Sequence, residues 1–381
     1  MKLGIDCRDL LAGSLNGIGR FVGNFLRAIS LQDDPPDLAL YGNQYTVFDL
    51  PESWGRPLRP RIRRAAEAAV WWWDRVTLPR MVKRDHLDVF LSPYFKAPGI
   101  RSCPVAITIH DLLFLRMPPD VSGRSGIYCR AFRALATSHA KRAAAVLTVS
   151  EYSRGDIIEL LNVPKKKTHV VGNCVGPAYA PTEDTDRIDA AKHACGIGAD
   201  YLLYVGNFGP HKNVGGLVET FAGLEPGLRS RLCLVLAGRH DKWTRPVRDA
   251  AARLGVADAV LTPGHVAEQL LPALYAGAAA FVTLSRWEGF GLPVLEAMAC
   301  GTPVLCSDRA SLPEVTGDAA LQIDPDDRAA CVDGLTRVLT DDGLRDRLRA
   351  AGPKRAKRFS PDRFAARALT ALDAAIKAGG R

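Results

Sequence analysis

The chain has 381 residues, of which 47% are hydrophobic and 24% charged, and its formal net charge is +9 at pH 7. This length allows two domains, and the composition is ordinary for a globular protein. The sequence contains no run of 18 apolar residues, which argues against a membrane-spanning helix. Its nine cysteines include no Cys-x-x-Cys pair, and its first residues do not resemble a signal peptide, so we expect a cytoplasmic protein without zinc or disulfides.

The positive charge fits three kinds of partner: a nucleic acid, an anionic membrane surface or a phosphorylated substrate. No nucleic-acid-binding motif accompanies the charge, so we expect no nucleic-acid partner. Peripheral contact with the inner face of a membrane stays open, and the oligomeric state is not predicted.

The first half of the chain alternates short apolar strands with helices. Residues 1–6 predict a strand, and a glycine-rich loop at 12–19 leads to an amphipathic helix at about 20–29. Strand, glycine-rich loop and helix form the phosphate-binding arrangement of doubly wound α/β domains. Further strands are predicted at 89–91, 105–109, 143–150 and 170–173, with Ser150 as the N-cap of the helix that follows it.

Three consecutive tryptophans, Trp71 to Trp73, begin a predicted helix that ends near Arg80. They cannot share one face of a helix, so at least one of them should be exposed or lie at an interface. Packing beneath the first sheet is one interpretation, and a platform for an acceptor or a membrane anchor is the other.

The second half repeats the alternation after a polar segment, 181–189, which is typical of a linker or surface loop. The strands predicted here lie at 201–205, 232–238, 260–266, 278–284 and 302–306. One helix is predicted to begin near 214, and the others lie at 270–277, 329–339, 343–351 and 361–377.

The most informative stretch runs from Ser285 to Glu296, between two of these strands. Pro293 suits the first position of a helix, and Gly301 suits the position just past its end. The glycines at 289 and 291 allow a close approach of backbone to a ligand, and the free N–H groups of the first helical turn favour a phosphate. A carboxylate repels phosphate, so Glu288 and Glu296 are better suited to accepting hydrogen bonds from sugar hydroxyls on either side of it. The stretch therefore predicts a sugar-nucleotide site.

Glu-x7-Glu around this Gly-Phe-Gly-Leu-Pro loop resembles the signature of the retaining glycosyltransferases of family 4, and the resemblance covers most of the chain from Gly17 to about Phe359. It implies the GT-B fold, an α/β architecture of two Rossmann-like doubly wound domains that face each other across a cleft. Residues 1–175 would bind the acceptor and residues 176–360 the nucleotide sugar, while residues 361–381 would form a helix that crosses back to the first domain.

The resemblance also implies roles for individual residues. Glu288 would hold the hydroxyls of the donor sugar and Glu296 those of the ribose, while His110, which ends a strand, would position the sugar. The amides of Phe290, Gly291 and Leu292 would bind the diphosphate, and the base would lie near Arg239 and the backbone of Val266. The remaining donor-binding positions implied are Gly17, Gly19, Gly206 and Asn207.

Lys212 occupies the position of a family lysine that stabilises the leaving diphosphate. Asn207, however, stands where the family often has an arginine, so one cation of the usual pair is missing. His211 is a candidate to compensate for it.

Two Asp-x-Asp triplets, at 184–186 and 324–326, could suggest a metal site. Both lie in acidic surface segments, and Asp326 or Asp327 is well placed to cap the next helix. The family needs neither metal nor cofactor, so we expect neither here.

The resemblance thus predicts a retaining hexosyltransferase that uses a nucleotide-diphosphate sugar and an acceptor hydroxyl, in glycan, glycolipid or secondary-metabolite biosynthesis. The segments 204–213 and 105–115 most resemble mannosyltransferases that use GDP-mannose, and a UDP-sugar is the alternative donor. A sugar-nucleotide epimerase, a phosphorylase and a non-catalytic sugar-nucleotide-binding subunit are the other interpretations.

Overall fold

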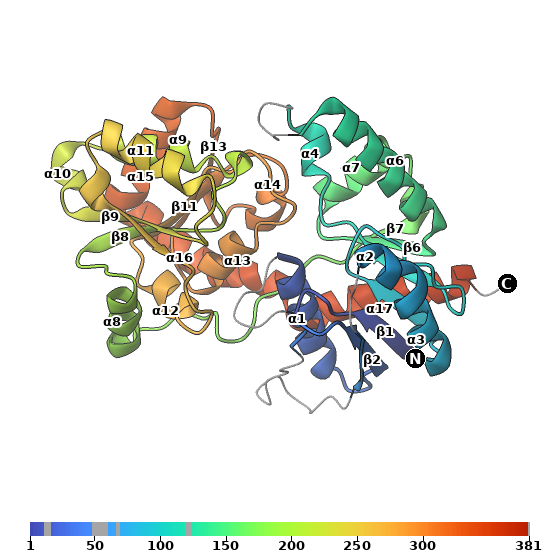
Figure 1. Ribbon diagram of the computed structural model, residues 1–381. Helices are drawn as coiled ribbons and strands as arrows, with labels where there is room; N and C mark the ends of the chain where they lie inside the picture. Colours follow the sequence, from blue (N-terminus) through green and yellow to red (C-terminus); the bar gives the residue numbers. More distant parts are fainter. Residues whose placement is uncertain (11–16, 48–59, 66–68, 119–123, 380–381) are drawn as a thin grey trace. The chain divides into compact units, whose positions relative to one another are not determined.

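The computed structural model describes residues 1–10, 17–47, 60–65, 69–118 and 124–379, which form two compact units. Unit 1 extends to Gly176 and includes the C-terminal segment from Phe359, while unit 2 contains Pro177–Arg358. Each unit has one parallel sheet flanked by helices (Figure 1).

The sheet of unit 1 has seven strands in the order β3-β2-β1-β4-β5-β6-β7, all pairs parallel. These are β1 (Lys2–Asp6), β2 (Asp37–Gly42), β3 (Arg61–Arg64), β4 (Val89–Ser92), β5 (Val105–Thr108), β6 (Ala145–Thr148) and β7 (Thr168–Val170). The helices and helical turns of the unit are α1 (Gly17–Ser30), α2 (Val70–Trp72), a π-helical turn (Trp73–Thr77), α3 (Leu78–Asp85), α4 (Leu113–Arg116), α6 (Gly126–Arg142), α7 (Glu151–Leu161), a 3₁₀ turn (Lys165–Lys167) and α17 (Pro361–Gly379).

The sheet of unit 2 has six parallel strands in the order β10-β9-β8-β11-β12-β13. These are β8 (Asp200–Val205), β9 (Leu232–Ala237), β10 (Val260–Gly264), β11 (Ala280–Thr283), β12 (Val304–Ser307) and β13 (Leu321–Ile323). Its helices are α8 (Thr185–Ala194), α9 (Val214–Ala222), α10 (Pro226–Arg229), α11 (Thr244–Arg253), α12 (Leu271–Ala276), α13 (Leu292–Ala299), α14 (Leu312–Thr316), α15 (Arg328–Thr340) and α16 (Asp342–Ala356). Short 3₁₀ turns lie at Pro210–Lys212, Ala257–Ala259 and Lys357–Phe359.

Unit 1 is closed by the last helix of the chain. Phe364 of α17 packs against Phe21 and Phe25 of α1, with ring centroids 5.3 and 5.9 Å apart. Figure 1 accordingly shows the red C-terminal helix beside the blue N-terminal one. The aromatic contacts hold the last helix within the first unit although more than 300 residues separate it from α1 in the sequence.

Local signals in the sequence set several helix ends as predicted. The Ser150 hydroxyl accepts a hydrogen bond from the Ser153 N–H and caps α7, and Asp327 caps α15 in the same way through the Ala330 N–H. Gly301 has a φ of 75° just beyond α13, a left-handed conformation that glycine adopts without strain.

Other helix boundaries differ from the prediction. α1 begins at Gly17 and not near Arg20, and Ile18 in its first turn is partly buried. Residues 12–16 of the predicted loop lie outside the described residues. α8 begins at Thr185, inside the segment interpreted as a linker, where Asp184 caps it. α16 continues to Ala356 through Pro353, five residues beyond the predicted end at 351.

The tryptophan cluster is divided between core and surface. Trp73 is buried, whereas Trp71 and Trp72 remain 62% and 46% exposed, so the prediction that at least one of the three is exposed is confirmed. The helix that they begin extends through the π-helical turn to Asp85, five residues beyond the predicted end. None of the helices in the described part of the chain combines the length and apolar character needed to cross a bilayer.

Candidate active site

The candidate site in unit 2 lies where the direction of strand connection reverses. β8 has β9 on one side and β11 on the other, so the loops after β8 and β11 open next to each other at the carboxyl edge of the sheet. Ligands of doubly wound sheets bind at this switch point. The Arg286 N–H donates to the His211 carbonyl at 2.8 Å and joins the two loops.

Lys212 and Glu288 meet at this point. The Lys212 ammonium lies 2.7 Å from both carboxylate oxygens of Glu288, and the two side chains are only 16% and 14% exposed. Lys212 ends the 3₁₀ turn Pro210–Lys212, and Asn213 follows in a left-handed conformation with a φ of 51°. The structure therefore brings together two predicted site residues that are 76 positions apart.

The Glu288 loop is fixed by a contact that the sequence analysis missed. The Ser311 hydroxyl donates to the Glu288 carbonyl at 2.9 Å. Ser311 follows β12, the neighbour of β11, so its position after an adjacent strand was the available signal. Gly291 has a φ of 93°, a conformation that strains other residues, and a Cβ there would lie 2.5 Å from Leu312 Cδ2 and displace that side chain.

The N-terminus of α13 faces the end of this loop. Gly291 is the N-cap residue and Leu292 the first residue of the helix, one position before the predicted Pro293. Phe290, Gly291 and Leu292 thus lie at the positive end of the helix dipole, where backbone N–H groups favour an anion.

Glu296 is buried in the second turn of α13, where only 1% of its surface is exposed. Its carboxylate accepts a hydrogen bond of 2.9 Å from the hydroxyl of Tyr275 on α12. A buried carboxylate needs such a partner, and Tyr275 was not singled out in the sequence because nothing local marks it. Tyr275 fixes one oxygen of Glu296.

Asn207 follows Gly206 after β8 and organises its own loop. Its side-chain oxygen accepts from the Gly209 N–H at 3.1 Å, and its carbonyl accepts from the Tyr204 hydroxyl at 2.7 Å. A Cβ on Gly206 would lie 2.7 Å from that hydroxyl, so glycine leaves room for Tyr204.

His211 supplies no positive charge to this loop at neutral pH. Burial, together with the neighbouring Lys212 ammonium, lowers the pKa of His211 from 6.5 to about 4. The imidazole can therefore exchange hydrogen bonds with a ligand, but it does not replace the missing arginine charge in the unliganded protein.

Arg239 and Val266 follow β9 and β10, on one side of the switch point. Arg239 is exposed and Val266 is buried. Beside them, Arg248 donates to the Thr262 hydroxyl at 2.9 Å, and His240 Nε2 lies 3.1 Å from the Thr262 carbonyl. Polar groups thus lie around Arg239 and Val266. The role of these two residues in binding the base stays a prediction.

His110 lies in unit 1, two residues beyond β5. Its Nε2 is 3.1 Å from the Pro93 carbonyl, an acceptor, so Nε2 carries the proton. Burial lowers the pKa of His110 to about 4, and the Phe21 ring packs edge-on against it at 4.9 Å. The neutral ring therefore has Nδ1 as its acceptor nitrogen. Gly17 and Gly19 are also in unit 1, in the first turn of α1 rather than in the predicted loop.

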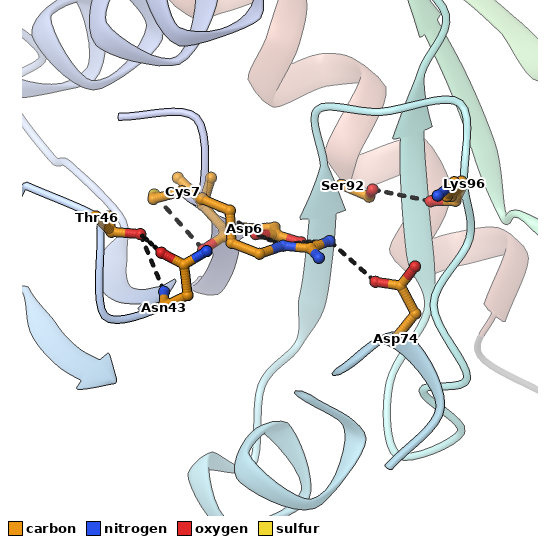
Figure 2. A network of polar contacts seen from close by, with 9 residues as sticks. Asp6, Cys7, Asn43, Thr46, Asp74, Ser92 and Lys96 are labelled. Atoms are coloured by element: carbon orange, nitrogen blue, oxygen red, sulfur yellow. Dashed lines mark hydrogen bonds and ion pairs between the residues drawn. The ribbon is translucent and has the colours of Figure 1, made fainter. Parts of the chain in front are cut away.

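Unit 1 has a polar cluster at the switch point of its own sheet, which the sequence analysis also missed (Figure 2). Arg8 Nη2 lies 2.8 Å from Asp6 and 2.9 Å from Asp74, and the guanidinium stacks over the rings of Trp73 and Tyr94. Burial raises the pKa of Asp6 although Arg8 opposes the shift. The available signal was a charged pair at the end of the first strand, with Asp6 its last residue and Arg8 two positions later.

The acidic triplets make local contacts. Asp184 accepts from the Arg187 N–H and caps α8, Asp324 binds Arg309, and Asp326 binds Arg286. Asp327, as predicted for one of the two residues, caps the next helix.

Comparison with known proteins identifies the family. Residues 188–355 match the family model described as glycosyl transferases group 1, and residues 15–179 match that of glycosyltransferase family 4. An O-antigen chain mannosyltransferase B from Escherichia coli is 30% identical over 361 residues, which cover 91% of this chain and 93% of that protein. The chain belongs to the group 1 glycosyltransferases. It is therefore a glycosyltransferase, as the Glu-x7-Glu resemblance predicted.

Other similarities agree with this family. O-antigen chain mannosyltransferase RfbU from Salmonella typhimurium is 31% identical over 258 residues, 68% of this chain and 67% of that protein. HepE from Anabaena, whose structure was determined with UDP and glucose, superposes with a TM-score of 0.77 at 18% identity, over 98% of this chain and 99% of that one. A sucrose-phosphate synthase from Thermosynechococcus elongatus gives a TM-score of 0.75 at 19% identity, over 97% of both chains. The GT-B fold class predicted from the sequence is confirmed.

Proposed function

We propose that this glycosyltransferase moves a hexosyl group from a nucleotide-diphosphate sugar to an acceptor hydroxyl, with GDP-mannose as the favoured donor and retention at the anomeric carbon. The Lys212–Glu288 pair carries the proposal, because it places a cation and a hydroxyl acceptor together at the switch point of unit 2. The mannosyltransferase names of the two curated relatives support mannose as the sugar.

Lys212 would act on the diphosphate. Its ammonium is now held by both oxygens of one carboxylate, at 2.7 Å each, and a diphosphate would compete for the same charge. Together with the N–H groups at the start of α13, Lys212 would neutralise the negative charge that grows on the departing phosphate.

Glu288 would bind the sugar while Lys212 binds the phosphate. Once the ammonium turns to the diphosphate, the two carboxylate oxygens are available to accept hydrogen bonds from sugar hydroxyls. Glu296 would accept hydrogen bonds from the ribose hydroxyls, with one of its oxygens already oriented by Tyr275. The pair of glutamates would thus hold the two rings on either side of the diphosphate.

The transfer step needs no enzyme nucleophile. The bond between the anomeric carbon and the diphosphate oxygen breaks, the acceptor oxygen bonds to that carbon from the same face, and the acceptor proton passes to the leaving phosphate oxygen. His110 would orient the sugar through its unprotonated Nδ1, since its Nε2–H is directed at the Pro93 carbonyl.

The acceptor would be a hydroxyl of a growing glycan or glycolipid, as the O-antigen names of the relatives suggest. An acceptor of this kind fits an enzyme that works peripherally at the inner face of a membrane. A small secondary-metabolite acceptor is the alternative.

Two observations favour other functions. The similarity to HepE, determined with UDP and glucose, favours a UDP-sugar donor. Asn207, in the position of the usual arginine, favours a sugar-nucleotide-binding subunit without turnover, because the neutral His211 does not restore the charge.

Calorimetric titration of GDP, UDP and ADP, without added metal, into the wild type and the variant Glu296→Ala tests the donor site. We expect one nucleotide, GDP, to bind best and to bind at least about tenfold more weakly to the variant, since ribose hydrogen bonds to a charged group are lost. Tyr275→Phe is the matched control, because it removes only the hydroxyl that orients Glu296. Preference for UDP would reassign the donor, and absence of binding to any nucleotide by the folded wild type would overturn the proposal.

A further inference from the structure

Helix α6 of unit 1 (Gly126–Arg142) turns most of its side chains to solvent. Only Ala136 and Ala140 of its 17 residues are buried. Residues spaced three and four positions apart form one outward stripe, and they line a shallow surface depression: Arg130, Arg133, Ala134, Thr137, Ser138 and Lys141. We call this stripe the α6 face.

The α6 face is basic and carries no carboxylate. The helix contains four arginine and lysine residues and neither Asp nor Glu. The Lys167 ammonium donates to the Lys141 carbonyl at 2.7 Å, which places the 3₁₀ turn Lys165–Lys167 at the end of the helix, where Lys165 and Lys166 are exposed. The positive charge of the stripe therefore continues beyond the helix.

Carboxylates on the neighbouring helices do not cancel this charge. α4 and α7 pack against α6; α4 carries no acidic side chain, and those of α7 are engaged elsewhere. Arg116 of α4 binds both Asp156 and Glu159 of α7, and Arg154 binds Glu151 within α7. Among the described residues, no carboxylate pairs with Arg130, Arg133 or Lys141, although Arg133 Nε donates to the Leu160 carbonyl at 2.6 Å.

Apolar side chains lie among these cations. Ile127 is 73% exposed and Leu135 46% exposed, two of the large hydrophobic residues that the described surface leaves in solvent. Ala131 and Ala134, also exposed, lie between them on the helix. Aliphatic groups gain nothing beside the phosphates of a nucleic acid, but they gain free energy on entering the boundary between lipid headgroups and acyl chains.

We propose that the α6 face, with Lys165 and Lys166 at its end, binds the anionic surface of a lipid bilayer. The cations would contact lipid phosphates while Ile127 and Leu135 enter the headgroup layer. This inference rests on the peripheral location proposed above, but not on the identity of the donor, and it assigns the contact to one helix.

Sedimentation with vesicles tests the proposal. The vesicles are phosphatidylcholine alone, or phosphatidylcholine mixed with an equal amount of phosphatidylglycerol. The wild type should bind the mixed vesicles, and added salt should weaken this binding through screening. Arg130→Glu/Lys141→Glu should lower the partition coefficient by at least about 25-fold, since each lost cation costs about fivefold. Ile127→Ser/Leu135→Ser should weaken binding without changing its salt dependence.

The control variant Arg347→Glu/Arg349→Glu makes the same change in net charge on exposed residues of α16, in unit 2. An equal loss in this variant would overturn the proposal, since net charge alone would then explain the binding. Failure of the wild type to bind mixed vesicles, or tighter binding to a short DNA duplex than to the vesicles, would overturn it too. GDP titration of every variant separates a failed membrane contact from a failed donor site, because no substituted residue belongs to the predicted donor site.

Discussion

The two sheets share one strand order around their switch points but build different ion pairs there. In unit 1, Arg8 binds Asp6 and Asp74 and is stacked over Trp73 and Tyr94. In unit 2, Lys212 binds Glu288 alone and no aromatic stacking on it is found among the described residues. The same topology therefore supports a cluster of several contacts in one unit and a single ion pair in the other.

The chemistry of the two cations explains the difference. A guanidinium is planar and offers several donors in fixed directions, so it can satisfy two carboxylates and two ring faces at once. An ammonium is a compact charge on a flexible stem, and it can leave one anion for another with little rearrangement. Lys212 is thus suited to exchange Glu288 for a diphosphate, while Arg8 is suited to remain in place.

The largest effect is expected from a substitution that breaks the ion-pair cluster of unit 1. Arg8→Met leaves Asp6, 1% exposed, without its partner, so we expect the free energy of unfolding to fall by about 3–5 kcal/mol, as measured by denaturant unfolding. Arg61→Met is the control, because the Arg61–Asp37 pair has a similar distance of 2.8 Å but side chains 37% and 51% exposed, and it should cost at most about 1 kcal/mol. Equal losses in the two variants would show that the cluster of unit 1 is no more tightly coupled than a surface pair.

The next largest effect is expected from a substitution that breaks the Lys212–Glu288 pair of unit 2. Lys212→Ala should lower kcat by about 100- to 1,000-fold, because it removes the cation proposed to act on charge developing in the transition state. The melting temperature should fall less than in Arg8→Met, since Glu288 is 14% exposed and Asp6 only 1%. Lys354→Ala, an exposed lysine of α16, is the control for loss of charge. If Lys212→Ala keeps full turnover, the pair is structural and the contrast between the two units disappears.

A smaller effect, on the pH dependence of the melting temperature, is expected from one histidine in each unit. Burial lowers the pKa of His110 and of His211 to about 4, below their ordinary value of 6.5. Because each pKa is lower in the folded state, the unfolded chain takes up protons first as the pH falls. The stability that each neutral imidazole contributes is therefore fully present above about pH 6.5 and is lost as the pH falls through about 4. His110→Gln and His211→Gln should each flatten the fall of the melting temperature over this interval. The wild type and both variants would have parallel curves if the imidazoles were solvated.

Local sequence patterns predicted most strands of both units but not β2, β3 or helix α6, and the family resemblance predicted the fold class. Apolar runs marked the buried strands, Ser150 and Asp327 marked the starts of helices, and Gly301 marked the end of one. Each of these signals depends on a few neighbouring residues, whose backbone conformation and capping are set over short distances. The motif from Ser285 to Glu296 indicated the family in the same way, because its loop, proline and helix are contiguous.

Contacts between distant segments were decided by the tertiary structure. The strand order brought Lys212 to Glu288, the packing of α12 on α13 brought Tyr275 to Glu296, and the π-helical turn brought Asp74 to Arg8, across 76, 21 and 66 positions of sequence. A single sequence has no local pattern that records such pairs, because they arise only when strands align and helices pack against one another. The sequence alone therefore determined which residue types were available for donor chemistry, while the tertiary structure decided which carboxylate each cation binds.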